Sequence, residues 1–251
     1  MNGFFSLLRF EHLKAKRNFS VWLILLLPWV LSLLNMVYIL YDARGHDGLY
    51  LNPWLYTVRY LFQLYVFLYP LLMGITSYSL FELEYRHSNF QRLFILPVSR
   101  NCVLGARLVF IWEVVTLSVL GAYAAFWTFS FPLSHFLPQY GFGEYDARGI
   151  MAVFFVKLYQ GSLVLVYLHY LFSCLFKRFS VVLGITCLGV MFSIVAANWE
   201  YVVYSPYYYP YRAYMSLMKE SISFINVGGI AEYRPPPECF HRWAESQLQY
   251  S

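Results

Sequence analysis

Two charged residues, Glu113 and Lys157, stand inside long apolar segments and are the first candidates for chemistry. Each lies about two helical turns or more from the nearer end of its segment, which predicts a position near the middle of a membrane. An unpaired ion there is costly, and ionisable residues inside a membrane commonly mark a functional site. Two interpretations are open: the two residues line a route for a polar substrate, or they form a structural ion pair between two helices. We prefer the ion pair.

The common catalytic and nucleotide-binding motifs are missing from the sequence. There is no G-x-x-x-x-G-K-[ST] phosphate-binding loop, no G-x-S-x-G and no H-E-x-x-H. The six histidines are scattered without metal-binding spacing, and none of the four cysteines forms a C-x-x-C pair. We therefore expect no catalytic centre, no metal site and no cofactor in this chain.

A polar stretch, Glu82–Arg100, separates two of the apolar segments. Its middle, Ser88–Leu96, is predicted to form a short helix, because Ser88 is a suitable N-cap and apolar side chains recur at helical spacing. Pro97 ends this helix, since the residue before a proline is pushed out of the helical region. A short amphipathic helix suits docking into a groove on a soluble partner. The residues expected to serve that partner are Glu84, Ser88, Asn89, Phe90, Leu93, Phe94, Pro97 and Arg100.

The composition is that of a membrane protein. The chain has 251 residues, of which 60% are hydrophobic and 12% are charged, whereas about 25% of a soluble domain is charged. The formal charge of +5 does not indicate nucleic-acid binding, because the basic residues flank apolar segments. No cleavable signal peptide is expected, because charges interrupt the first residues and no small-residue cleavage site follows the apolar run.

We predict an all-α polytopic fold with an N-terminal interfacial helix and five membrane spans. Residues 2–18 carry apolar side chains followed by a basic cluster, which indicates a helix in the membrane interface. A basic anchor that only sets the topology is the alternative for this segment. The predicted spans are residues 21–41, 55–81, 103–131, 150–176 and 181–197.

The distribution of lysine and arginine predicts a cytoplasmic N-terminus in the cell membrane. Ten basic residues fall on the side of the N-terminus and three on the opposite side. The ten are Arg9, Lys14, Lys16, Arg17, Arg86, Arg92, Arg100, Arg107, Lys177 and Arg178, and the three are Arg44, Arg59 and Arg148.

The remainder of the chain, residues 198–251, differs from the transmembrane domain of residues 1–197. Tyrosines crowd around Pro206 and Pro210, and aromatic residues at such density belong at a membrane interface. The two prolines prevent a simple spanning helix. We expect an extracytoplasmic, tyrosine-rich region that re-enters the membrane partway and continues into a polar tail.

The loop resembles the first cytoplasmic loop of type-2 ABC exporter permeases, especially the small permeases of lantibiotic immunity and peptide export. The likeness rests on Glu84, Phe90, Leu93 and the run Leu96-Pro97-Val98-Ser99-Arg100. It extends to the interfacial helix, which such permeases carry as an elbow before their first span, and to the broken helices after the fifth span. The family usually has six spans, so the five predicted here are a departure.

The resemblance implies a permease subunit of an ATP-driven exporter rather than an enzyme. A separate ATPase subunit is expected to dock on the loop, and a second copy or a sister permease is expected to complete the transporter. The implied substrate is a peptide, a lipid-like molecule or an antibiotic. The alternative is a non-transport assembly or sensor subunit that recruits a cytoplasmic partner; an intramembrane enzyme is poorly supported, because no nucleophile and base are recognisable.

Overall fold

A computed structural model describes residues 2–42, 53–86, 100–138, 142 and 148–215 of the chain. Within these ranges every regular element is a helix and none is a strand. The elements are α1 (Asn2–Ala15), α2 (Phe19–Asp42), α3 (Pro53–Arg86), α5 (Arg100–Ser130), α6 (Leu133–Phe136), α7 (Arg148–Leu175), α8 (Phe179–Val195), η3 (Glu200–Tyr204) and η4 (Pro206–Tyr208).

Four helices, α2, α3, α5 and α7, are long and apolar enough to cross a membrane. The fifth apolar helix, α8, has 17 residues, which is about 26 Å of helix against a hydrocarbon core of about 30 Å. Each of the five predicted spans is therefore a helix, and a short separate helix precedes them. The predicted all-α polytopic membrane fold is confirmed.

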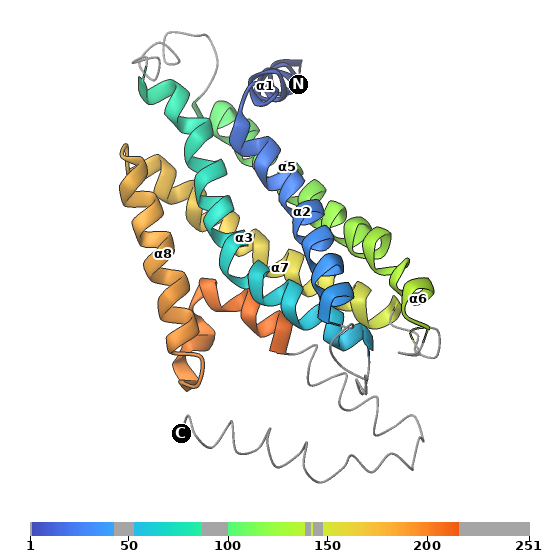
Figure 1. Ribbon diagram of the computed structural model, residues 1–251. Coiled ribbons are helices and arrows are strands. Elements are labelled where there is room, and N and C mark those ends of the chain that lie inside the picture. Colours follow the sequence, from blue (N-terminus) through green and yellow to red (C-terminus); the bar gives the residue numbers. More distant parts are fainter. Residues whose placement is uncertain (1, 43–52, 87–99, 139–141, 143–147, 216–251) are drawn as a thin grey trace.

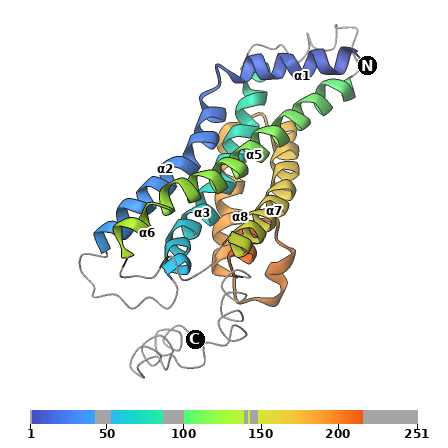
Figure 2. The same cartoon turned by 90° about the vertical axis from the view of Figure 1, so that its right-hand side faces the viewer.

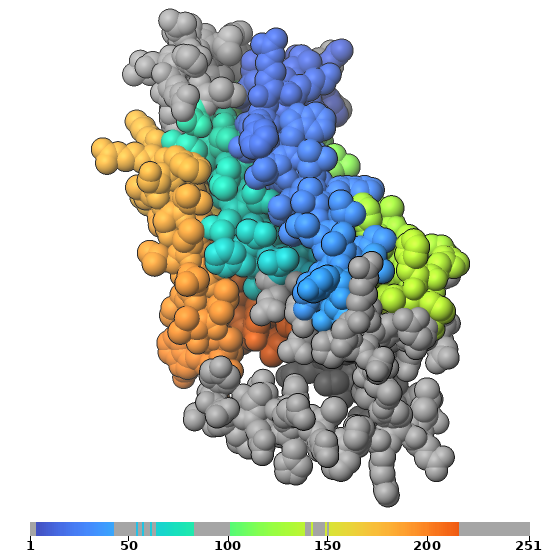
Figure 3. All heavy atoms as spheres, viewed as in Figure 1, coloured from blue at the N-terminus to red at the C-terminus, as the bar shows by residue number. Residues whose placement is uncertain are grey.

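α3 lies at the centre of the bundle, where it packs against α2, α7 and α8. α5 packs against α1, α2 and α7. Figure 1 shows the long helices side by side with α1 at one end, and Figure 2 shows α1 lying across that end, beside the start of α5. We call this end, which also holds the end of α3, the α1 end. The side chains of α2 and α3 lie next to each other on the face seen in Figure 3.

A buried hydrogen bond explains how α2 tolerates a proline in its interior. Pro28 has no N–H and cannot donate to the carbonyl of Ile24 one turn earlier. The Ser118 hydroxyl of α5, which is fully buried, donates to that carbonyl at 2.8 Å. The neighbouring helix thus replaces the missing bond, as a proline inside a membrane helix requires.

Residues 200–215 fold back against α7 and α8 instead of leaving the bundle. Tyr207 is buried against Gly189 of α8, where an added Cβ would overlap the tyrosine ring. Tyr209 lies against Gly161 of α7, where an added Cβ would stand 2.9 Å from the Cβ of Tyr209. Two glycines on different helices therefore make room for this return segment.

The return segment reaches well inside the bundle. Gly189 precedes the end of α8 at Val195 by six residues, about 9 Å along the helix axis. The sequence predicted that the tyrosine-rich region re-enters the membrane partway. That residues 198–251 as a whole form one extracytoplasmic region stays a prediction, because residues 216–251 lie outside the described part of the chain.

Candidate functional site

In the chain, the predicted partner-binding loop connects the last turn of α3 to the first turn of α5. Glu84 lies in that last turn of α3, and Arg100 is the first residue of α5. Residues 87–99 lie outside the described residues, so Ser88, Asn89, Phe90, Leu93, Phe94 and Pro97 are not placed. The structure describes instead the two helices that precede and follow these residues in the chain, and the helix α1 beside them.

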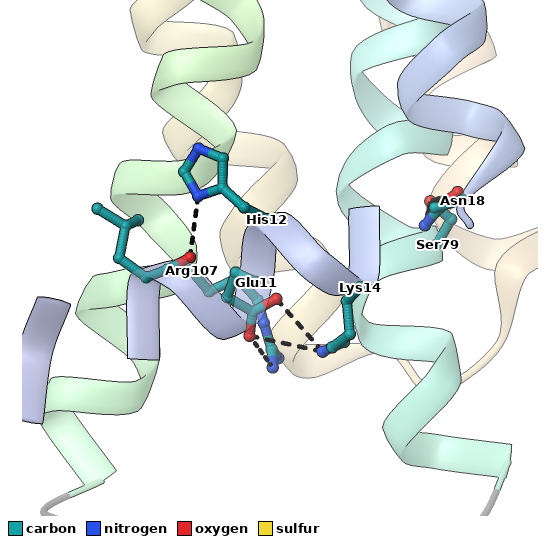
Figure 4. A network of polar contacts seen from close by, with 7 residues as sticks. Glu11, His12, Lys14, Asn18, Ser79 and Arg107 are labelled. Carbon is teal, nitrogen blue, oxygen red and sulfur yellow. Dashed lines mark hydrogen bonds and ion pairs between the residues drawn. The ribbon is translucent and has the colours of Figure 1, made fainter. Parts of the chain in front are cut away.

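A buried ion pair joins α1 to α5 near the start of that loop-bearing helix. Arg107 Nη2 lies 3.2 Å from Glu11 Oε1, and the two residues are only 1% and 4% exposed. Lys14, one turn further along α1, approaches Glu11 Oε2 at 3.3 Å. Figure 4 shows both cations facing the Glu11 carboxylate. Because a buried carboxylate needs compensation for its lost hydration, the pair holds α1 in one position on α5.

The same arginine contacts the end of α3. The Arg107 guanidinium lies 4.5 Å from the ring centroid of Phe81, in the geometry of a cation–π contact. Phe81 is fully buried and packs edge-on against Tyr170 of α7. Glu11, Phe81 and Arg107 therefore form a junction of α1, α3 and α5, which we call the charged junction.

The turn between α1 and α2 is tied to α3 as well. Asn18 caps α2 by accepting a hydrogen bond from the Ser20 backbone N–H at 3.0 Å. Its amide also donates to the Ser79 hydroxyl of α3 at 3.1 Å, and Thr76 donates to the Ser20 carbonyl at 3.3 Å. The α1 segment is thus fixed to both helices that carry the loop.

The ion-pair partner of Glu113 is His12 of α1. Its carboxylate lies 3.0 Å from His12 Nε2, with the Glu113 side chain 39% exposed. The prediction paired Glu113 with Lys157, but the structure places the carboxylate against this histidine, and Lys157 is partly buried on α7. The reason is that α1 packs against the first half of α5, which brings His12 within reach of Glu113.

A further polar cluster lies deeper in the bundle, beside the return segment. His169 of α7 is fully buried, and its Nδ1 stands 3.4 Å from the Thr186 hydroxyl of α8. Thr186 itself donates to the Val182 carbonyl at 2.8 Å. The Tyr207 ring meets the His169 ring edge-on, with centroids 5.7 Å apart. This cluster joins α7, α8 and the return segment through polar side chains inside the bundle.

Sequence reasoning missed the charged junction and the buried histidine. Arg107 counted only among the ten basic residues on the side of the N-terminus, and Glu11 was not among the candidate residues. One signal was available: Glu11 shares a face with Phe4, Leu8 and Ala15 at helical spacing, and an acid on a buried face requires a cation. No comparable signal marks His169.

Comparison with protein families matches the chain over residues 7–195 to the ABC-2 family transporter protein model. The match runs from the first half of α1 to the last residue of α8, and so includes the charged junction and all five apolar helices. Neither a curated protein nor a solved structure matches the chain. The chain belongs to the ABC-2 family of transporter proteins, as a membrane subunit of an ABC transporter.

Proposed function

We propose that the chain is the permease subunit of an ATP-driven exporter and that a separate ATPase subunit docks on the loop of residues 87–99. Family membership supports the transporter role and implies the ATPase partner. The observation that carries the mechanism is the charged junction, in which one buried arginine contacts both α1 and the end of α3.

On this proposal, closure of the ATPase subunits moves the loop and the two helices that hold it. Because Asn18 ties the α1–α2 turn to α3 and Arg107 ties α1 to α5, these segments move as one body. That body shifts against α7 and α8 and opens a route for substrate. A second permease copy or a sister permease completes the route, and the permease needs no catalytic site of its own.

The substrate class rests on the likeness to the permeases of lantibiotic immunity and peptide export. We propose a peptide, a lipid-like molecule or an antibiotic, moved out of the cell or out of the membrane.

The proposed topology places the α1 end in the cytoplasm. Cys102, an exposed residue at the start of α5, then faces the cytoplasm, whereas Cys239 lies outside the cell. A membrane-impermeant thiol reagent on intact cells should label Cys239 and spare Cys102 until the cells are lysed. Single-cysteine versions of the protein make the two signals separable. Labelling of Cys102 in sealed cells, or protection of Cys239, would contradict this topology.

Replacing Phe90 by aspartate should remove the ATPase from the complex while the permease stays folded. An aromatic anchor at the centre of an interface typically contributes about 2 kcal/mol or more, and a charge in its pocket adds a desolvation cost. The measurement is co-purification of the ATPase with tagged permease. The matched control is Phe136→Asp, which puts the same change at an exposed phenylalanine of α6, away from the α1 end.

Full retention of the ATPase by the Phe90→Asp protein, with unchanged transport-coupled hydrolysis, would show that the loop is only a connector. Equal loss in the Phe136→Asp control would point to a general folding defect and would also count against the proposed docking site.

A further inference from the structure

The fully charged side chains on the outward face of α1 and the α1–α2 turn are all basic. Arg9, Lys16 and Arg17 are exposed along it. Glu11 is the sole acid among residues 2–41. It is turned into the bundle, where Arg107 and Lys14 face its carboxylate. Burying the one acid of this segment leaves an outer surface without a negative charge of its own.

Large apolar side chains are exposed between these cations. The exposed fraction of Phe19 reaches 76%, and the other members of the set are half or more exposed: Phe5, Phe10, Leu13 and Trp22. The Trp22 indole N–H donates to the Lys16 carbonyl at 3.2 Å, which holds this ring beside the basic pair Lys16 and Arg17. Cations and aromatic rings therefore alternate on one corner, which we call the α1–α2 corner.

That alternation fits one environment, the boundary between lipid headgroups and acyl chains. There the apolar rings enter the acyl region, while basic side chains extend toward phosphate oxygens at the surface. A neutral lipid headgroup carries a cation of its own beside the phosphate, whereas an anionic headgroup leaves the negative charge uncompensated. The charge of the corner thus complements anionic phospholipid.

We propose that the α1–α2 corner binds the headgroups of anionic phospholipids, with Arg9, Lys16 and Arg17 as the contacts that select them over zwitterionic lipids. The proposal needs only the membrane fold and the geometry of the corner. It stands whether or not an ATPase docks on the loop of residues 87–99. The consequence is that this permease retains anionic lipid at α1 through purification.

The test uses the purified full-length chain in a neutral detergent, titrated with phosphatidylglycerol or with phosphatidylcholine, and native mass spectrometry counts the bound lipids. Each basic residue near an anionic surface raises binding by about fivefold. Arg9→Gln/Lys16→Gln/Arg17→Gln should therefore weaken phosphatidylglycerol binding by about a hundredfold, with phosphatidylcholine binding unchanged. High salt should produce the same loss in the wild-type protein, because it screens these exposed charges.

Two matched variants identify the corner as the site. Lys177→Gln/Arg178→Gln removes two exposed cations from the α7–α8 turn and should leave most phosphatidylglycerol binding intact. Arg9→Lys/Lys16→Arg/Arg17→Lys keeps the charge and should bind like the wild type. Equal retention of the two lipids by the wild type, or an equal loss in the α7–α8 variant, would overturn the proposal.

Discussion

Replacing Glu11 by glutamine is expected to destabilise the protein more than replacing Lys14 by glutamine. The change keeps the size of the side chain but removes a negative charge 3.2 Å from a guanidinium that is 1% exposed. Breaking a buried ion pair from one side typically costs about 3–5 kcal/mol. The free energy of unfolding in detergent, or the midpoint of thermal unfolding, measures this loss.

Lys14→Gln is the matched control for that prediction. Lys14 contacts the same carboxylate at 3.3 Å, but its side chain is nearer to solvent and Arg107 keeps its place beside Glu11. Because Arg107 still compensates the Glu11 carboxylate, the loss for Lys14→Gln should be smaller than the loss for Glu11→Gln. Similar losses for Glu11→Gln and Lys14→Gln would show that burial does not govern this cluster.

The double variant Glu11→Gln/Arg107→Met separates the ion pair from simple packing. Methionine retains much of the arginine stem, and removing both charges leaves no buried ion of the pair. We expect the double variant to recover part of the stability lost in Glu11→Gln. Strictly additive losses would mean that the two side chains do not interact.

The second large effect is expected at Gly189, where even one methyl group collides with the return segment. An alanine Cβ at this position overlaps the Tyr207 ring, which is itself buried against His169. Overpacking a tight site typically costs about 1–3 kcal/mol, and here it should release residues 200–215 from α8. Thermal unfolding reports the cost, and limited proteolysis in detergent reports the release.

Gly184→Ala is the control within the same helix, because an added Cβ there meets no other atom within 4 Å. Alanine in a helix interior is favoured over glycine by about 0.5–1 kcal/mol, so this variant should be neutral or slightly stabilised. A Gly189→Ala protein that behaves like Gly184→Ala would contradict the close packing of Tyr207.

The helices of this fold were predictable because membrane-spanning segments can be recognised from their length and apolar composition alone. Long apolar runs predicted α2, α3, α5 and α7, and the short apolar run after Lys177 predicted α8. Pro28 lies inside a span, but the hydroxyl that compensates for its missing N–H, that of Ser118, stands on another helix and could not be identified from spacing.

The polar contacts were harder to predict, because they depend on how each helix is rotated about its axis. Glu113 and Lys157 were paired by depth along their helices, yet α1 brings His12 to Glu113 instead. Family resemblance indicated a broken helix after α8, but its close fit required Gly161 and Gly189, which sit on two separate helices. A single sequence does not show how each helix is rotated about its own axis.

The 96-residue separation between Glu11 and Arg107 has a consequence for biosynthesis. At a synthesis rate of about 5–20 residues per second, α1 exists for roughly 5–20 s before Arg107 is made. Throughout that interval Lys14, three residues along the same helix, is the nearest counter-charge available to Glu11. The first helix to leave the ribosome, α1, therefore reaches its final place only after the third long helix, α5, has been inserted. The order in which the helices pack thus differs from the order in which they are synthesised.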